Sequence, residues 1–309
     1  MERPDRRRDN DMPRLGVKID SRPAEDLPGL ASLAERTGFD QLWVCEDLGL
    51  AGGIAQATAA LAVTNRLEVG LGIVPSAVRN AMYLAMELSA VTRLSAGRFH
   101  AGIGHGVSHW LSQVGQHPRS LLTCLREVTE SVQALLEGKE VTYTGEHVEL
   151  DTVSLTHPPD LAPPLSLGVR GPRGITLAKD LGVGVILAEG STPEYVADVR
   201  RRLGPTACIT VFVWSNLDPD NAERGRSALA PTVAAALNNS RLAAQLGDLY
   251  QRQVNADSVR RLTVSGDPQA FRDSIDLLSD SGANSIVFQP ILGREEEQME
   301  LISRHVLQP

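Results

Sequence analysis

The sequence is poor in aromatic residues, in cysteine and in net positive charge. Aromatics make up 4% of its 309 residues, which argues against a surface that stacks nucleic-acid bases. The net charge is −8, so neither a phosphate backbone nor an anionic membrane is an expected partner. Cys45, Cys124 and Cys208 are widely spaced and form no CxxC or zinc pattern. We therefore expect a cytoplasmic protein that binds no metal, nucleic acid or membrane.

Long apolar runs are also missing. No stretch has the length of a membrane span, and the arginine-rich start lacks the apolar segment of a signal peptide. HExxH, a P-loop and an ordered Ser/His/Asp arrangement are absent as well. Residues 1–12 are almost entirely polar with balanced charges, so we expect a disordered tail rather than a nucleic-acid arm.

From residue 13 onward, short apolar strands alternate with helices. Strand signals fall at 15–19, 41–45, 67–74, 99–103, 165–169, 183–188, 208–214 and 285–288. Helical periodicity lies between them, most clearly at 119–137, and residues 140–150 predict a small hairpin. Helical sequence near 216–260 interrupts the alternation. Eight strand–helix units predict an α/β fold, a (β/α)₈ TIM barrel with insertions, as one domain over residues 13–309.

In such a barrel the active site lies at the C-terminal ends of the strands, where this sequence has glycines. The stretch 93–110, RLSAGRFHAGIGHGVSHW, ends its strand with Gly102, Gly104 and Gly106, and His105 lies between the last two. A glycine backbone lets a flat ligand lie close, and histidine exchanges a proton near neutral pH. A GxGxG pattern alone is more often a plain turn, so it does not establish a ligand by itself.

The fifth strand ends in GVRGPRG, residues 168–174, a glycine-rich turn that leads into a helix. Free backbone N–H groups at a helix N-terminus suit a phosphate, and Arg170 and Arg173 add positive charge. The alternative is a tight turn with solvated arginines. Taken alone, the residues favour neither interpretation.

Charged side chains follow the second and third strands. Glu46 and Asp47 could act as general acid and base, or could hydrogen-bond a ring, whereas a helix cap or a solvated loop is the simpler interpretation. For Arg79, just past the third strand, a surface salt bridge is the simplest interpretation. His109 and Trp110 either line a pocket or pack beneath the loop.

Six stretches, in order, resemble one known family. They are GFDQLWVCED, TNRLEVGLGIVPSAVRNA, LSAGRFHAGIGHGVSHWLSQVG, LREVTESVQALLEGKEVTYTGEHVELD, PPLSLGVRGPRGITLAKDLG and STPEYVADVRRRL. The chain resembles the bacterial luciferase-like (LLM class) flavin and deazaflavin oxidoreductases. Within them it is most similar to the branch that uses coenzyme F420, which includes methylenetetrahydromethanopterin reductase. The resemblance is good over residues 14–215, thins over 216–260 and returns weakly at the last two units.

The resemblance implies a barrel that holds a flat tricyclic cofactor at its mouth, coenzyme F420 or alternatively FMN. It also implies a cis peptide at Gly72-Ile73, a homodimer through the helices of the second and third units, and hydride transfer involving a small organic substrate. The cofactor-binding residues that it implies are Glu46, Gly72, Ile73, Val74, His105, Gly106, Val169, Arg170, Gly171, Arg173 and Gly174. The candidates for proton transfer are Glu46, Asp47, His105 and His109.

The chain departs from the family where protons are handled. Asp47 stands where deazaflavin relatives have a histidine, Val107 replaces an acid, and Val183 replaces an aspartate. Three functions stay open: an F420-dependent oxidoreductase, an FMN-dependent luciferase-like monooxygenase, and a catalytically degenerate cofactor-binding protein or partner subunit. The acidic pair Glu46-Asp47 and the stretch 141–151 favour the first.

Overall fold

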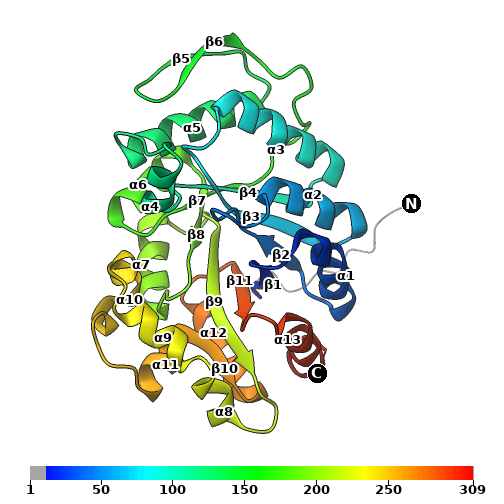
Figure 1. Ribbon diagram of the computed structural model, residues 1–309, viewed down its shortest axis with the longest axis vertical. Helices are drawn as coiled ribbons and strands as arrows, with labels where there is room; N and C mark the ends of the chain where they lie inside the picture. The colour runs from blue at the N-terminus through cyan, green and yellow to red at the C-terminus, as the bar shows by residue number, and fades with distance from the viewer. Residues whose placement is uncertain (1–11, 309) are drawn as a thin grey trace.

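The computed structural model describes residues 12–308, so the predicted tail lies outside the described residues except for Met12. Eight parallel strands close into a barrel, which Figure 1 shows with helices around it. The strands are β1 (Arg14–Ile19), β2 (Gln41–Val44), β3 (Glu68–Pro75), β4 (Phe99–Gly104), β7 (Leu165–Gly168), β8 (Gly184–Leu187), β9 (Ile209–Leu217) and β11 (Ser285–Pro290). Pairing of β8 with β9 and of β11 with β1 closes the ring. The predicted barrel is confirmed, and each strand lies within three residues of its predicted bounds.

A long helix follows each barrel strand and covers the outside. These helices are α1 (Leu27–Thr37), α2 (Gly53–Val63), α3 (Ala81–Ser95), α5 (Leu121–Leu136), α6 (Pro172–Leu181), α7 (Pro193–Leu203), α12 (Pro268–Asp280) and α13 (Glu295–Ile302). Side-chain caps start several of them: Asn80 accepts the Met82 N–H, and Thr192 accepts the Tyr195 N–H. The apolar faces of the helices pack on the outward faces of the strands to form the main core.

The barrel interior is also packed. Trp43, Ile186, Phe212 and Val287 form a separate cluster, with Ile73 against it. The rings of Trp43 and Phe212 lie edge to face, with centroids 5.5 Å apart. Because these side chains fill the centre, a ligand has access only from the mouth, where the strands end.

The predicted hairpin forms as β5 (Val141–Thr144) and β6 (Glu149–Val153), at the top of Figure 1. Its turn is held by Glu127 of α5, whose two carboxylate oxygens accept backbone N–H groups of Glu146, His147 and Val148. The short helix α4 (Ser108–Gln113) lies between β4 and α5. The hairpin turn is therefore fixed to α5.

The insertion is helical, as predicted, but it is broken into short pieces. They are α8 (Ala222–Ser227), α9 (Ala230–Leu237), α10 (Ala243–Leu246) and α11 (Ala256–Leu262), with 3-10 turns at 240–242 and 247–249. Pro231 begins one piece, and Asn239 caps the next turn. The pieces share a small core of their own with Trp214 of β9. The strand β10 (Thr263–Gly266) was not predicted; it pairs with the C-terminal half of β9.

Within residues 12–308, no helix combines the length and the apolar character needed to cross a membrane.

Candidate active site

Glycine lines one side of the barrel interior. Strands β3, β4 and β7 contribute five glycines, which we call the glycine wall: Gly70, Gly72, Gly102, Gly104 and Gly168. A Cβ added at any of them would lie 2.2–2.9 Å from another heavy atom. These positions therefore have no room for a side chain of their own.

Ile73 lies over this wall. The peptide between Gly72 and Ile73 is cis, as the resemblance implied. A Cβ on Gly104 would lie 2.9 Å from Ile73 Cγ1, and one on Gly168 would lie 2.7 Å from Ile73 Cγ2. The half-buried Ile73 side chain thus makes an apolar surface at the mouth. The next residue, Val74, is completely buried in the main core, so its side chain does not reach the mouth.

Buried charged residues also lie at the mouth. Lys18 of β1 is 9% exposed, and its Nζ lies 2.8 Å from Glu189 Oε1 and 3.1 Å from Asp20 Oδ2. We call these three residues the charged cluster. Its ammonium also lies 5.4 Å from the ring centre of Phe212, and Gln289 Nε2 donates to Asp20 Oδ2 at 3.1 Å. Glu189 follows β8, so the Lys18–Glu189 pair spans the barrel.

The members of the charged cluster stabilise each other's ionised forms. Burial by itself lowers the pKa of Lys18, but Glu189 and Asp20 together raise that pKa well above its ordinary value. Burial likewise raises the pKa of Glu189, but Lys18 brings that pKa below its ordinary value. The pair is therefore ionised over the neutral pH range.

Glu46 is held by three hydrogen bonds from two residues. Its Oε2 accepts the Gly53 N–H at 3.0 Å and Arg79 Nη2 at 3.0 Å, and its Oε1 accepts Arg79 Nη1. Arg79 Nε also lies 3.0 Å from Glu87 Oε2. Glu46 is thus a carboxylate that fixes the loop after β2 to the start of α2. The predicted salt bridge of Arg79 is present, and its partner is this candidate site residue.

Asp47 lies within the electrostatic field of the charged cluster. Burial raises the pKa of the Asp47 carboxyl; Lys18 opposes this rise, whereas Asp20 and Glu189 add to it. The result is a pKa above the ordinary value for aspartate. Burial also raises the pKa of the neighbouring Cys45 thiol to about 12, so this cysteine stays a thiol.

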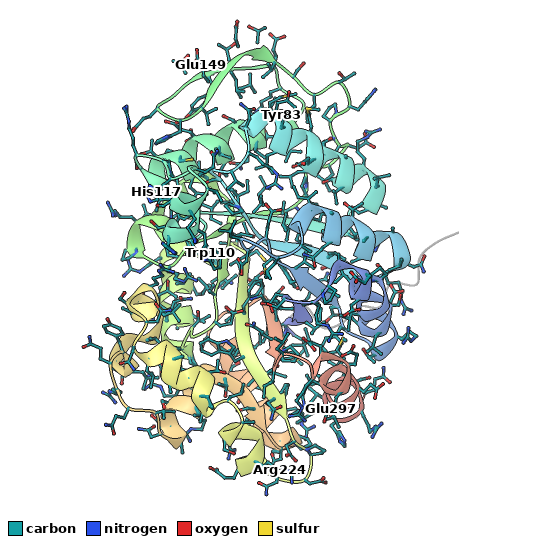
Figure 2. All side chains as sticks on the ribbon, in the orientation of Figure 1. Tyr83, Trp110, His117, Glu149, Arg224 and Glu297 are labelled. Atoms are coloured by element: carbon teal, nitrogen blue, oxygen red, sulfur yellow. The ribbon has the colours of Figure 1, made fainter. Side chains whose placement is uncertain are left out.

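The turn after β4 brings His105 to the mouth. His105 Nδ1 lies 3.3 Å from the Leu121 carbonyl oxygen. Burial lowers the pKa of His105, the Leu121 carbonyl opposes this effect, and Arg170 lowers the pKa further. Gly106 follows with a φ of +69°, so the turn requires a glycine there. His109 is exposed on α4, and Figure 2 shows its neighbour Trp110.

The first turn of α6 is open. Gly171 precedes the helix with φ −92° and ψ 164°, and no side chain caps the N-terminus. A Cβ on Gly171 would meet no atom within 4 Å, whereas one on Gly174 would lie 2.7 Å from the buried Val169. Arg173 is exposed on the same turn. The free N–H groups and the helix dipole make this turn suitable for a phosphate.

Arg170 connects this turn to the insertion. Its Nε donates to Gln245 Oε1 at 3.1 Å, and Gln245 Nε2 donates to the Ala188 carbonyl at 2.8 Å and to Ser191 Oγ at 2.7 Å. The Tyr195 hydroxyl donates to the Arg170 carbonyl. The buried Gln245 of α10 thus holds the loops after β7 and β8 together.

Sequence reasoning missed the charged cluster and Gln245. A signal was available for Lys18 and Glu189, because each is a charged residue at the end of an otherwise apolar strand. Nothing in the sequence marks Gln245, which lies in a region of weak resemblance. Among residues 12–308, no group of three or more His, Cys, Asp or Glu side chains is placed to hold a metal ion.

Comparison with known proteins gives consistent sequence matches. The chain matches the family described as luciferase-like monooxygenase over residues 10–285. The 5,10-methylenetetrahydromethanopterin reductase of Methanolobus tindarius is 21% identical over 94% of this chain and 98% of its own length. The F420-dependent glucose-6-phosphate dehydrogenase of Nocardia farcinica is 24% identical over 85% of this chain and 87% of its own length.

Solved structures share the fold. The coenzyme F420 dependent tetrahydromethanopterin reductase from Methanopyrus kandleri has a TM-score of 0.81 at 19% identity, covering 96% of this chain and 99% of that one. The oxygenating constituent of 3,6-diketocamphane monooxygenase from Pseudomonas putida, in complex with FMN, has a TM-score of 0.74 at 14% identity, covering 96% and 98%. Because the family match spans most of the sequence, this chain belongs to the luciferase-like monooxygenase family.

Proposed function

We propose that this chain is an oxidoreductase that uses coenzyme F420 and transfers a hydride between it and a small organic substrate. The observation that carries the proposal is the open first turn of α6 beside the glycine wall. Relatives named as an F420-dependent dehydrogenase and as a reductase support the choice of cofactor. When bound, the deazaflavin accepts or donates the hydride.

The residues at the mouth fit such a cofactor. A flat ring needs a smooth apolar support, which the Ile73 side chain provides where it lies against Gly104 and Gly168. The phosphate needs N–H donors and positive charge, which Gly171, Gly174 and Arg173 supply at the start of α6. Arg170 holds this turn through its hydrogen bond to Gln245, and the buried Val169 packs against Gly174.

We assign proton transfer and the orientation of the loop after β2 to different residues at the mouth. Asp47 is our choice for the proton donor or acceptor, because its raised pKa lets it hold a proton nearer to neutral pH. His105 favours the neutral form and contacts the edge of the ring. Glu46 orients the loop, since Arg79 and the Gly53 N–H occupy its oxygens. His109, exposed on α4, is a secondary candidate.

The first test is a titration of the purified protein with coenzyme F420 and with FMN, followed by cofactor fluorescence. We expect saturable binding of F420 and weak binding of FMN. A preference for FMN would replace the proposal with a luciferase-like monooxygenase. Binding of neither cofactor would replace it with the degenerate protein or partner subunit.

A matched pair of variants at Gly171 tests the phosphate position. Gly171→Asp and Gly171→Asn both place a capping side chain in open space, and each stabilises α6 by about a few tenths of a kcal/mol. Only the aspartate adds a negative charge, so we expect it to weaken F420 binding by about tenfold or more relative to the asparagine variant. Equal affinities for the two variants would show that the phosphate does not sit at this turn.

We further propose a homodimer formed through α2 and α3. Tyr83, Met86 and Leu94 share one face of α3 and are 66%, 46% and 77% exposed, and Val63 of α2 is also exposed. Figure 2 shows Tyr83 on this helix. Light scattering should give a dimer for the wild type and a monomer for Met86→Glu. Leu161→Glu, which changes an exposed leucine on the connector before β7, serves as the control.

The remaining proposals concern the cellular compartment and the class of substrate. The three cysteines are free, and Cys45 and Cys124 are buried, which supports a reducing cytoplasm. A small-molecule substrate, rather than nucleic acid or a membrane surface, suits the net charge of −8. A substrate screen with F420 as hydride carrier is the measurement that follows a positive titration.

A further inference from the structure

A cavity of about 270 Å³ lies beside the barrel mouth, between the start of α3, the loop before α5 and the hairpin turn. Its lining includes Ser76, Arg79, His117, Cys124 and His147. Among the described residues that line it, none is aspartate or glutamate, although the chain has 38 acidic and 30 basic residues. The lining thus presents donors and no carboxylate to the cavity, whereas Glu46, Glu87 and Glu127 bind Arg79, His147 and Val148 from behind it.

Two buried polar atoms face this cavity without a hydrogen-bond partner. Ser76 is 2% exposed, and its Oγ is unpartnered, although the Cys124 thiol lies near it. His147 Nε2 is also buried and unpartnered. Glu146 Oε1 lies 3.6 Å from this nitrogen, beyond hydrogen-bond distance, on an exposed side chain. A buried polar group without a partner is unfavourable, and a ligand that forms a hydrogen bond with it would remove this penalty.

The same cavity is supplied with donors. Helix α3, 15 residues long, begins at Ala81 in the lining, so its positive end faces the space. Arg79 uses three of its five N–H groups on Glu46 and Glu87, which leaves two. His117, labelled in Figure 2, is also in the lining, and its Nε2 lies 2.7 Å from Ser108 Oγ.

We propose that this cavity binds a small oxyanion, a phosphate or a carboxylate group. The volume holds such a group with several waters, since a water occupies about 30 Å³ in the liquid. The Ser76 hydroxyl, His147 Nε2 and Arg79 donate to the anion, and the α3 N-terminus adds its dipole. The site is distinct from the turn at α6, and it does not depend on the identity of the cofactor. Arg79 contacts both the anion and Glu46, so it connects this site to the candidate active site.

The test must distinguish this cavity from the start of α6, because inorganic phosphate is expected to bind there as well. Histidine imidazole nitrogens are followed by NMR while phosphate, or in a second series acetate, is added at constant ionic strength. We expect the His147 and His117 signals to shift with one shared, saturable midpoint, while the exposed His157 does not move. Saturation with phosphate alone identifies a phosphate site, and saturation with acetate alone identifies a carboxylate site. Absence of saturable shifts with both anions overturns the proposal.

Ser76→Ala is the variant that tests the donor set. Removing a hydroxyl that donates to an anion should raise the midpoint by about tenfold or more. Ser32→Ala, in which the lost hydroxyl donates only to a carbonyl of α1, is the matched control and should leave the midpoint unchanged. His signals of the anion-free variant report whether the fold is intact. An unchanged midpoint in folded Ser76→Ala would refute the proposed donor set and the site with it.

Discussion

Two regions of the barrel mouth, the glycine wall and the charged cluster, are built on opposite principles. On the glycine wall, the glycines of β3, β4 and β7 leave room for side chains such as Trp43 and Ile73, because a Cβ on any of these glycines would collide. In the charged cluster, by contrast, Lys18 of β1 and Glu189 after β8 place buried, paired charges at the mouth. Shape is therefore set on one side and electrostatic potential on the other.

This difference determines what each side tolerates. A glycine of the glycine wall is constrained by the atoms that face it. The loss of stability caused by a larger residue therefore depends on whether those facing atoms can move. A buried ion is constrained by its partner, so the cost depends on whether a charge is left alone. Substitutions can separate the two principles, because one acts through volume and the other through charge.

The largest effect is expected from Lys18→Met. This variant removes the cation but leaves Glu189 and Asp20 in a buried site, and we expect a loss of about 3–5 kcal/mol in the free energy of unfolding. Urea denaturation at neutral pH measures it. The double variant with Glu189→Gln should recover part of the loss, because one uncompensated charge is then gone.

The loss of stability in Lys18→Met should depend on pH. The pKa of Lys18 is raised on folding, so its contribution is present below the ordinary lysine value of about 10.4 and is lost as the pH rises through the folded pKa. The pKa of Glu189 is lowered on folding, so its contribution is present above about 4.3 and is lost as the pH falls. The deficit of Lys18→Met should therefore shrink on acidification. A deficit independent of pH would mean that lost packing, and not charge, destabilises the variant.

The glycine wall should respond to volume at its base. In Gly70→Ala, the new Cβ would lie 2.2 Å from the buried Trp43 ring, which cannot move away. We expect a loss of about 1–3 kcal/mol, measured by thermal or urea unfolding. Gly29→Ala in α1 is the control, because no atom lies within 4 Å of its Cβ and helical alanine stabilises by about 0.5–1 kcal/mol. Equal stabilities of the two variants would contradict the collision.

Near the mouth the same substitution should affect binding more than stability. In Gly168→Ala the Cβ would meet Ile73 Cγ2 at 2.7 Å, and Ile73 is only half-buried, so it can shift outward. We expect a loss of less than about 1.5 kcal/mol in stability but a clear loss of F420 affinity, measured by fluorescence titration. Unchanged affinity would place the ring away from Ile73.

The sequence predicted the glycine side and not the charged side, for a physical reason. Buried parallel strands are apolar along their length and glycines stand out within them, so the eight strands and the turns at Gly104 and Gly171 could be predicted. Lys18 and Glu189 lie 171 positions apart, and only closure of the barrel brings them together. The strand β10 was missed because four residues, TVSG, carry no apolar alternation. The roles assigned to Asp47, His105 and His109 stay predictions.

The smallest effect, and the sharpest probe of the charged side, is expected from Asp47→Asn. The pKa of Asp47 is raised on folding, so its carboxylate destabilises the folded protein once the pH exceeds the ordinary aspartate value of about 3.9. Replacement by the neutral amide should raise stability at neutral pH by about 0.5 kcal/mol or less, and this gain should vanish in acid.

Combining Asp47→Asn with Glu189→Gln sharpens the comparison further. Glu189 raises the pKa of Asp47, so the gain from Asp47→Asn should shrink when Glu189 is already neutral. In Gly168→Ala the gain should be unchanged, since the glycine wall acts through shape. Melting temperatures of the two double variants against pH measure both effects, with the exposed Asp160→Asn as control. Coupling of Asp47 to Gly168 as strong as to Glu189 would mean that shape and charge are not separate at this mouth.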